Sequence, residues 1–243
     1  MERVCEIQSS FRQGAITIEA PGEVSRAILE DKRIILLRSA LPVDLLMKAR
    51  DSVLRWRRDV PAASTNDFKG NYHRQRCQMI KTTAPHVFHD YNFIALDRLD
   101  PVIGRPLHAL FEPLRRLYNE LTGHDVEFGH AESAPYLQPQ VIQYPPGGGF
   151  FGRHEHAFEP QRIGIIVQMS EAGKDYHGGG TVFEIDGDVI DFEGNSRLGD
   201  ICLWPFDVPH WVKQSDLSEP FDWQSERGRW VATFPHNNPF GRF

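Results

Sequence analysis

Residues 140–159 read QVIQYPPGGGFFGRHEHAFE and combine a strand pattern, a glycine-rich turn and two closely spaced histidines. An apolar run suited to a buried strand ends at Tyr144, a Pro-Pro-Gly-Gly-Gly turn follows, and the chain then reaches His154 and His156. In an extended segment alternate side chains point to the same face, so both histidines face one way and Glu155 faces the other. Two imidazoles placed in this way form a chelating pair for a metal ion.

Short β-rich runs surround this turn and continue toward the C-terminus. Between about residues 139 and 235 they read QVIQY, RIGIIVQM, GTVFEI, DVIDF, DICLW and RWVATF, and Gly, Asp and Pro separate them. Many short strands at such spacing favour an antiparallel sandwich or barrel. A third metal ligand must come from another strand, and His210, just after the run DICLW, is the first candidate.

The first half of the chain has helical periodicity in two places. Residues 33–37 (RIILL) predict a strand, and residues 100–122 predict an amphipathic helix that Gly123 ends. The apolar positions of that helix are Val102, Leu107, Leu110, Leu114, Leu117 and Leu121. An earlier helical face after the strand is formed by Leu45, Leu46, Ala49, Val53 and Trp56.

Residues 59–85 are rich in Pro, Ser, Asn and Gly and predict a long loop. This loop holds a basic cluster of His73, Arg74, Arg76 and Lys81. The chain is therefore predicted to be one α+β domain over residues 1–243. Residues 1–135 would supply helical support and strands, and residues 139–235 the β core with the metal site.

The composition excludes several classes of protein. The 243 residues are 40% hydrophobic and 25% charged, which is typical of a globular protein. Lys and Arg number 27 against 33 Asp and Glu, a net charge of −6 that argues against a nucleic-acid partner. Three widely separated cysteines form no disulfide framework, and no apolar run approaches the roughly 20 residues of a membrane span. We therefore expect a cytoplasmic protein without a membrane partner.

The order of the motifs resembles the iron(II)/2-oxoglutarate-dependent dioxygenases of the prolyl-hydroxylase and phytanoyl type. In that family a tyrosine, a Pro-Gly-Gly turn, H-x-D/E, an apolar strand, G-G-x-T-x-F, G-D, a distal histidine and a later arginine follow one another. The matching positions here are Tyr144, Gly147 and Gly148, His154, Gly179 to Phe183, Gly199 and Asp200, His210, and Arg229. The resemblance covers about residues 139–235. It implies a double-stranded β-helix, a jelly-roll barrel of cupin type, with N-terminal supporting helices.

The resemblance also implies cofactors and roles for individual residues. The cofactors would be Fe(II), 2-oxoglutarate and O2, with 2-oxoglutarate converted to succinate and CO2 while a substrate C–H bond is oxidised. Arg229 would pair with the distal carboxylate of 2-oxoglutarate, because the guanidinium fork matches a carboxylate bidentately. Arg227 has the same strand parity and is the alternative. Tyr144 and Thr181 would also contact the cosubstrate.

One position departs from the family pattern. His156 stands where the family has Asp or Glu, so the carboxylate of the usual metal triad is missing from its place. His156 itself could complete a neutral three-histidine site, or Glu155 or Glu159 could supply a carboxylate through a local bulge. A third possibility is a metal held by two side chains only, although His156 is not a small residue. A neutral imidazole in place of a carboxylate raises the charge of the metal centre by one unit.

Three classes of function remain open at this point. The first is an iron(II)/2-oxoglutarate oxygenase acting on a small molecule, since the chain has no appended recognition domain or basic surface. The second is a three-histidine metal-dependent dioxygenase or hydrolase of cupin type that does not use 2-oxoglutarate. The third is a non-catalytic barrel that binds a metal or a small ligand.

Overall fold

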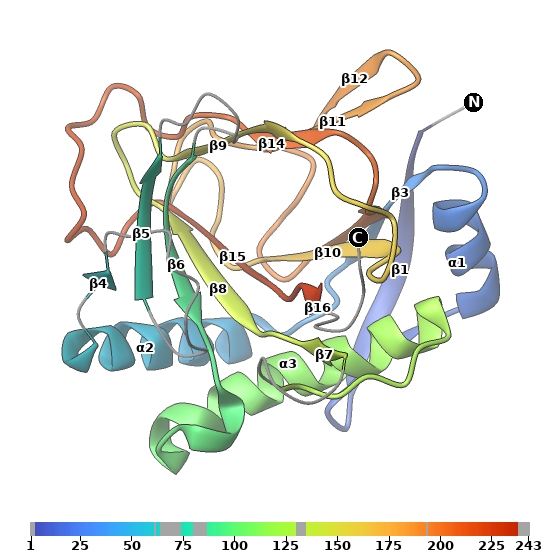
Figure 1. Cartoon of the computed structure of the whole chain (residues 1–243), viewed down its shortest axis with the longest axis horizontal. Coiled ribbons are helices and arrows are strands. Elements are labelled where there is room, and N and C mark those ends of the chain that lie inside the picture. Colours follow the sequence, from blue (N-terminus) through green and yellow to red (C-terminus); the bar gives the residue numbers. More distant parts are fainter. Residues whose placement is uncertain are drawn as a thin grey trace.

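A computed structural model describes residues 3–60, 62–63, 74–79, 87–129, 135–192 and 194–237 (Figure 1). The helices of these ranges are α1 (Pro21–Leu29), α2 (Val43–Asp59), the 3-10 turn η1 (Leu96–Arg98) and α3 (Pro101–Thr122). The strands are β1 (Val4–Arg12), β2 (Ala15–Ile18), β3 (Ile34–Arg38), β4 (Ala62–Ala63), β5 (Arg74–Met79), β6 (Val87–Phe93), β7 (Tyr136–Leu137), β8 (Gln140–Tyr144), β9 (Phe150–His154), β10 (Ile163–Gln168), β11 (Thr181–Ile185), β12 (Asp188–Asp191), β13 (Ile201–Pro205), β14 (His210–Val212), β15 (Arg229–Thr233) and β16 (His236–Asn237).

Most strands belong to one continuous sheet. Its order is β12-β11-β14-β9-β6-β8-β15-β10-β13-β3-β1-β2, with β5 attached to β6 and β4 to β5. Strand β6 pairs with β8 along one part of its length and with β9 along another, so it joins two arms of the sheet. We call β9, β14, β11 and β12 the minor arm, and the strands from β8 to β2 the major arm.

The two arms face each other across a shared interior. Phe183 of β11 packs with Trp204 of β13, at 5.4 Å between ring centroids, although several strands separate β11 from β13 in the sheet order. Val212 of β14 likewise belongs to an apolar cluster with Ile142 of β8. Figure 1 shows β9, β14 and β11 passing above β8, β15 and β10. The sheet therefore folds back on itself and encloses a space between its arms.

Helices α2 and α3 cover the outer face of the major arm. Because strand side chains alternate, Ile165 and Val167 of β10 pack with the helices, whereas Ile166 points to the interior. Helix α3 buries the leucines predicted from its periodicity, each contributing roughly 1.5–3 kcal/mol by leaving water. Gly123 caps this helix with φ of 73°, as predicted. Val102 is 67% exposed, because it lies in the first turn of α3 beyond the sheet, so its predicted place in the core was wrong.

The sequence-based prediction of the strands is confirmed where the pattern was strong. Each of the six predicted C-terminal runs overlaps a strand, RIILL overlaps β3, and the face from Leu45 to Trp56 lies in α2. The chain is mostly sheet with few helices. Among the helices of the described ranges, none combines the length and apolar character that crossing a bilayer requires.

The predicted loop over residues 59–85 was partly wrong. Residues 74–79 form β5, which pairs antiparallel with β6 from Arg74 opposite Asn92 to Met79 opposite Val87. The run RQRCQM lacks the β-branched residues typical of strands, so its conformation depends on the hydrogen bonds of its partner strand. His73 and Lys81 of the predicted basic cluster lie outside the described residues.

Candidate metal and cosubstrate site

Three histidines meet at the interior face of the minor arm. His154 ends β9 and His210 begins β14, and the antiparallel register places the two directly opposite each other. His156 follows two residues after the end of β9. One ring nitrogen of each histidine lies within 4.8 Å of the others, and the ring centroids of His154 and His210 are 4.3 Å apart. The structure thus brings together the three predicted metal ligands.

Backbone hydrogen bonds orient two of the three imidazoles. Nδ1 of His154 lies 2.8 Å from the carbonyl oxygen of Gly152, and Nδ1 of His210 lies 2.8 Å from that of Val208. A carbonyl oxygen only accepts, so each Nδ1 carries the proton and donates it. The lone pair of each ring is consequently on Nε2, the atom free to bind a metal ion.

His156 is held in a different way. Its ring stacks on Phe206, with ring centroids 4.3 Å apart and an interplanar angle of 3°. Phe206 lies directly after β13 and lines the cavity, although the sequence analysis did not name it among the site residues. The only signal was its position four residues before His210 in WPFDVPH.

Partial removal from water lowers the pKa of all three histidines, most completely for the buried His210 and less so for His156, whose surface is exposed. It lowers the pKa of His154, and it lowers the pKa of His156 to about 4 and that of His210 to about 3, with the neighbouring His154 as a second cause for the latter two. Protons therefore do not compete with a metal ion for the ring lone pairs near neutral pH.

The carboxylate alternatives do not join this group. Glu159 is exposed and forms an ion pair with Arg162 at 2.8 Å, and Glu155 is exposed as well. Within the described part of the chain, the ligand group around His154 contains histidines and no carboxylate. The geometry thus favours the three-histidine arrangement.

Arg229 is a buried cation without an anionic partner among the described residues. Arg229 is 3% exposed, and its Nη2 donates to Oγ1 of Thr181 at 2.8 Å. Nε and Nη1 are buried and have no hydrogen-bond partner in the part of the chain that the structure describes. Burying a guanidinium without a counter-ion costs several kcal/mol, so this position suits an anionic ligand.

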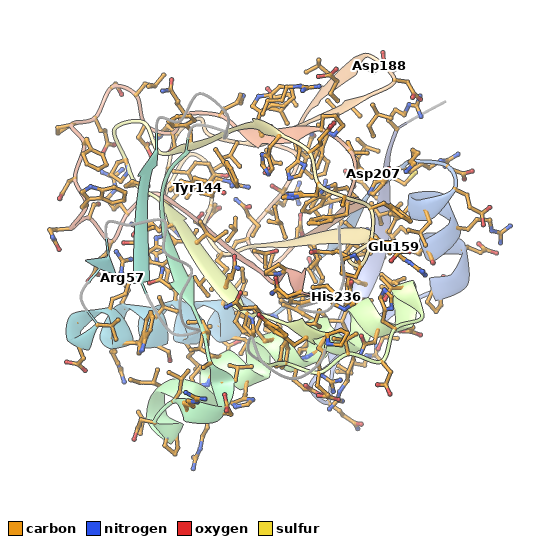
Figure 2. All side chains as sticks on the ribbon, viewed as in Figure 1. Arg57, Tyr144, Glu159, Asp188, Asp207 and His236 are labelled. Carbon is orange, nitrogen blue, oxygen red and sulfur yellow. The ribbon has the colours of Figure 1, made fainter. Side chains whose placement is uncertain are left out.

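Tyr144 and Thr181 flank this guanidinium from opposite arms. Tyr144 of β8 is the cross-strand neighbour of Arg229, whose Cζ lies 5.3 Å from the tyrosine ring centroid. Burial raises the pKa of Tyr144 to about 12, against the opposing effect of the Arg229 charge, so the phenol stays protonated. Figure 2 shows Tyr144 at the end of β8 that lies away from α3. The three predicted cosubstrate residues therefore converge.

A cavity of about 210 Å³ joins the two groups of residues. The three histidines, Tyr144 and Thr181 line it, and most of its other lining side chains are apolar or aromatic. Arg229 lines an adjoining void of about 10 Å³, which shares Thr181 and Ile166 with the cavity. Arg227, the alternative cation, is instead half-exposed and pairs with Glu219 through two contacts of 3.0 Å.

Comparison with known proteins finds similar structures but no similar sequence. No family model matches the sequence, and no curated protein matches it. A prolyl-4-hydroxylase from Pseudomonas putida has a TM-score of 0.55 at 18% identity, over 88% of this chain and 97% of that chain. A Trichoplax adhaerens prolyl hydroxylase, in complex with a hypoxia-inducible-factor peptide fragment, has a TM-score of 0.58 at 13% identity, over 90% of both chains.

A third similar structure is identified by its protein family. An oxidoreductase of the 2OG-Fe(II) oxygenase family from Burkholderia pseudomallei has a TM-score of 0.52 at 14% identity, over 95% of this chain and 94% of that chain. This chain shares its fold with the 2OG-Fe(II) oxygenases. At these identities the likeness establishes the fold, and the chemistry must be argued from the residues of the site.

Proposed function

We propose that this protein is an iron(II)- and 2-oxoglutarate-dependent oxygenase that oxidises a C–H bond of a small molecule, and that its two arms form a double-stranded β-helix. One observation carries the proposal. A cavity between the arms is lined by three neutral imidazoles, and a small void that adjoins it is lined by a buried guanidinium without an anionic partner among the described residues. A metal ion satisfies the first group and a carboxylate satisfies the second.

His154, His156 and His210 would hold the iron, because their pKa values leave the lone pairs free at neutral pH. When bound, iron, O2 and 2-oxoglutarate together supply the oxidant, and 2-oxoglutarate leaves as succinate and CO2. The protein itself supplies ligand geometry, through the backbone hydrogen bonds of two histidines and the aromatic stacking of the third.

Arg229, Thr181 and Tyr144 would hold the distal carboxylate of 2-oxoglutarate. Nε and Nη1 of Arg229 are the unused donors. Oγ1 of Thr181 accepts from Arg229, so its own proton remains available for a carboxylate oxygen. The protonated phenol of Tyr144 provides a further donor. Charge-assisted hydrogen bonds of this kind are among the strongest in proteins.

The cavity supports a small substrate with a largely apolar body. Its aromatic walls, including Phe151, Trp204 and Phe234, exclude water from the space beside the histidines. A volume of about 210 Å³ is below the range of roughly 300–1,000 Å³ that drug-sized ligands occupy. The net charge of −6 gives no electrostatic attraction for nucleic acid.

The decisive experiment is an anaerobic titration of the Fe(II)-loaded protein with 2-oxoglutarate. Chelation of iron by the keto acid produces a visible charge-transfer band, which we expect in the wild-type protein and not in Arg229→Gln. Arg227→Gln is the matched control, because that guanidinium already pairs with Glu219 at the surface and its loss should leave the band intact.

The same titration tests a second candidate function. A ligand group of three histidines also fits a cupin-type dioxygenase that does not use 2-oxoglutarate. If the wild-type protein binds iron and forms no band at saturating 2-oxoglutarate, the oxygenase proposal fails and this second function becomes the better one.

A further inference from the structure

A second group of metal-ligand side chains lies outside the cavity, where two loops meet. His177 belongs to the segment between β10 and β11, and Asp216 and Glu219 belong to the segment between β14 and β15. One ligand atom of each lies within 4.8 Å of the others. None of the three lines the cavity of the histidine site.

Backbone hydrogen bonds hold the three residues in place. The N–H of His177 donates to Oδ1 of Asp216 at 2.8 Å, and the N–H of Asp216 donates to the carbonyl oxygen of His177 at 2.8 Å. The N–H of Glu219 donates to the carbonyl oxygen of Asp216 at 2.9 Å. The group is therefore positioned by the main chain and does not depend on the chance meeting of flexible side chains.

Asp216 has an unused carboxylate oxygen. Its side chain is 1% exposed, Oδ1 accepts from the backbone, and the buried Oδ2 has no hydrogen-bond partner among the described residues. The imidazole of His177 does not satisfy this carboxylate, because its Nδ1 lies 3.6 Å from Oδ1. Buried carboxylate oxygens are normally paired, so an unpaired one points to a bound cation.

We propose that His177, Asp216 and Glu219 form a second metal site, which binds Zn²⁺ or a similar first-row divalent ion. One imidazole nitrogen and two carboxylate oxygens are ligands that Zn²⁺ accepts, with water in the fourth position. The side chain of His177 is 66% exposed, which leaves an open path for the ion.

Arg227 orients the third ligand of this site. It donates to both oxygens of Glu219 at 3.0 Å, and each carboxylate oxygen keeps a second lone pair for a metal ion. Hydrogen-bonded partners of this kind commonly fix the orientation of metal-binding carboxylates. The two carboxylates together with Arg227 carry one net negative charge, which favours a divalent cation.

The site would brace the loops that lead into the cosubstrate residues. Gly178, next to His177, forms a β-bridge with Ser215, next to Asp216. The first loop continues directly to Thr181 and the second ends at Arg229. A metal ion here would tie together the two segments that position this hydrogen-bonded pair. The site itself does not depend on the proposed oxygenase activity.

The test is zinc binding to the full chain in a background without the first site. In His154→Ala/His210→Ala, equilibrium dialysis against Zn²⁺ followed by metal analysis should find one bound ion. Adding His177→Ala should weaken zinc binding by at least about tenfold, the loss typical of a perturbed metal site. His177 is exposed, so this change should leave the fold and the melting temperature of the metal-free protein unchanged.

A second variant and a control complete the design. Asp216→Asn removes the charge and should also lose the ion, whereas Asp222→Asn should retain it, because Asp222 is an exposed carboxylate of the same loop. If the double variant does not fold, the wild-type protein should bind two zinc ions and His177→Ala one. No zinc in the double variant when it is folded, or equal zinc affinity with and without His177 and Asp216, would overturn the proposal.

Discussion

Replacement of Arg229 by methionine should stabilise the protein in the absence of ligand while it abolishes 2-oxoglutarate binding. Two of the guanidinium nitrogens are buried without partners among the described residues, and each such group costs about 1–3 kcal/mol. The hydrogen bond from Nη2 to Thr181 returns about 1 kcal/mol. Methionine has a similar length and no charge, so the free energy of unfolding should rise by about 1–4 kcal/mol, as for other buried ions replaced by apolar side chains.

Arg57→Met is the matched control, because Arg57 is equally buried but paired. It donates to Oδ2 of Asp90 at 3.0 Å and to Oε1 of Gln143 at 2.7 Å, and Figure 2 shows it rising from α2. Removing one partner of a buried pair leaves an uncompensated charge, so this variant should lose about 3–5 kcal/mol. The two substitutions of the same type should therefore change stability in opposite directions.

Urea unfolding of the metal-free proteins measures the first effect, and urea unfolding of the Fe(II)-loaded proteins with and without 2-oxoglutarate measures the second. In the presence of Fe(II), 2-oxoglutarate at about 100 times its dissociation constant should raise the free energy of unfolding of the wild-type protein by about 2.7 kcal/mol. The same ligand should not change the free energy of unfolding of Arg229→Met. A loss of more than about 1 kcal/mol in ligand-free Arg229→Met would refute the reasoning, since it would mean that the protein already satisfies this guanidinium.

Three further predictions concern neighbouring parts of the molecule. Phe206→Ala should weaken Fe(II) binding by about tenfold in a competition assay with a chelator, because His156 loses its stacking partner, and unchanged affinity would contradict this. Gly164→Ala should lower the free energy of unfolding by about 1–3 kcal/mol or more in urea, since a Cβ there would lie 2.2 Å from the indole of Trp204. Burial lowers the pKa of His236 from 6.5 to about 4 in the folded protein. As the pH falls, His236 therefore takes up a proton in the unfolded chain at a higher pH than in the folded protein. Stability should therefore decrease between pH 6.5 and 4, by up to about 1.4 kcal/mol per pH unit for this group, and His236→Phe should show a shallower loss in urea unfolding across that range.

Elements with a strong local pattern were predictable from the sequence. The apolar runs at β8, β10 and β13 are bounded by Gly, Pro and Asp, and α3 has an apolar stripe that ends at a glycine. These signals depend only on neighbours within a few residues. The approach of His154 and His156 was also expected from the sequence, although β9 ends at His154 and strand alternation therefore does not by itself place His156.

Strands that depend on their partners were not predictable. Four of the six residues of strand β5 are Arg or Gln, and its conformation follows from pairing with β6. Strand β1 is only partly buried and runs parallel to β3, from Val4 opposite Ile34 onward. In both cases the free energy that decides the conformation comes from hydrogen bonds and packing with residues distant in the chain.

The residues of the metal and cosubstrate sites show the same difference between what the local sequence indicates and what contacts between distant segments decide. The spacing of the histidines can be read from the sequence, whereas the choice of Arg229 rested on the family resemblance, because Arg227 has the same strand parity. The register that sets His154 opposite His210, the stacking of Phe206 on His156, and the lack of an anion beside Arg229 among the described residues are decided by tertiary structure. A burial energy or an unpaired charge is a property of everything that surrounds a group, and only the folded chain specifies those surroundings.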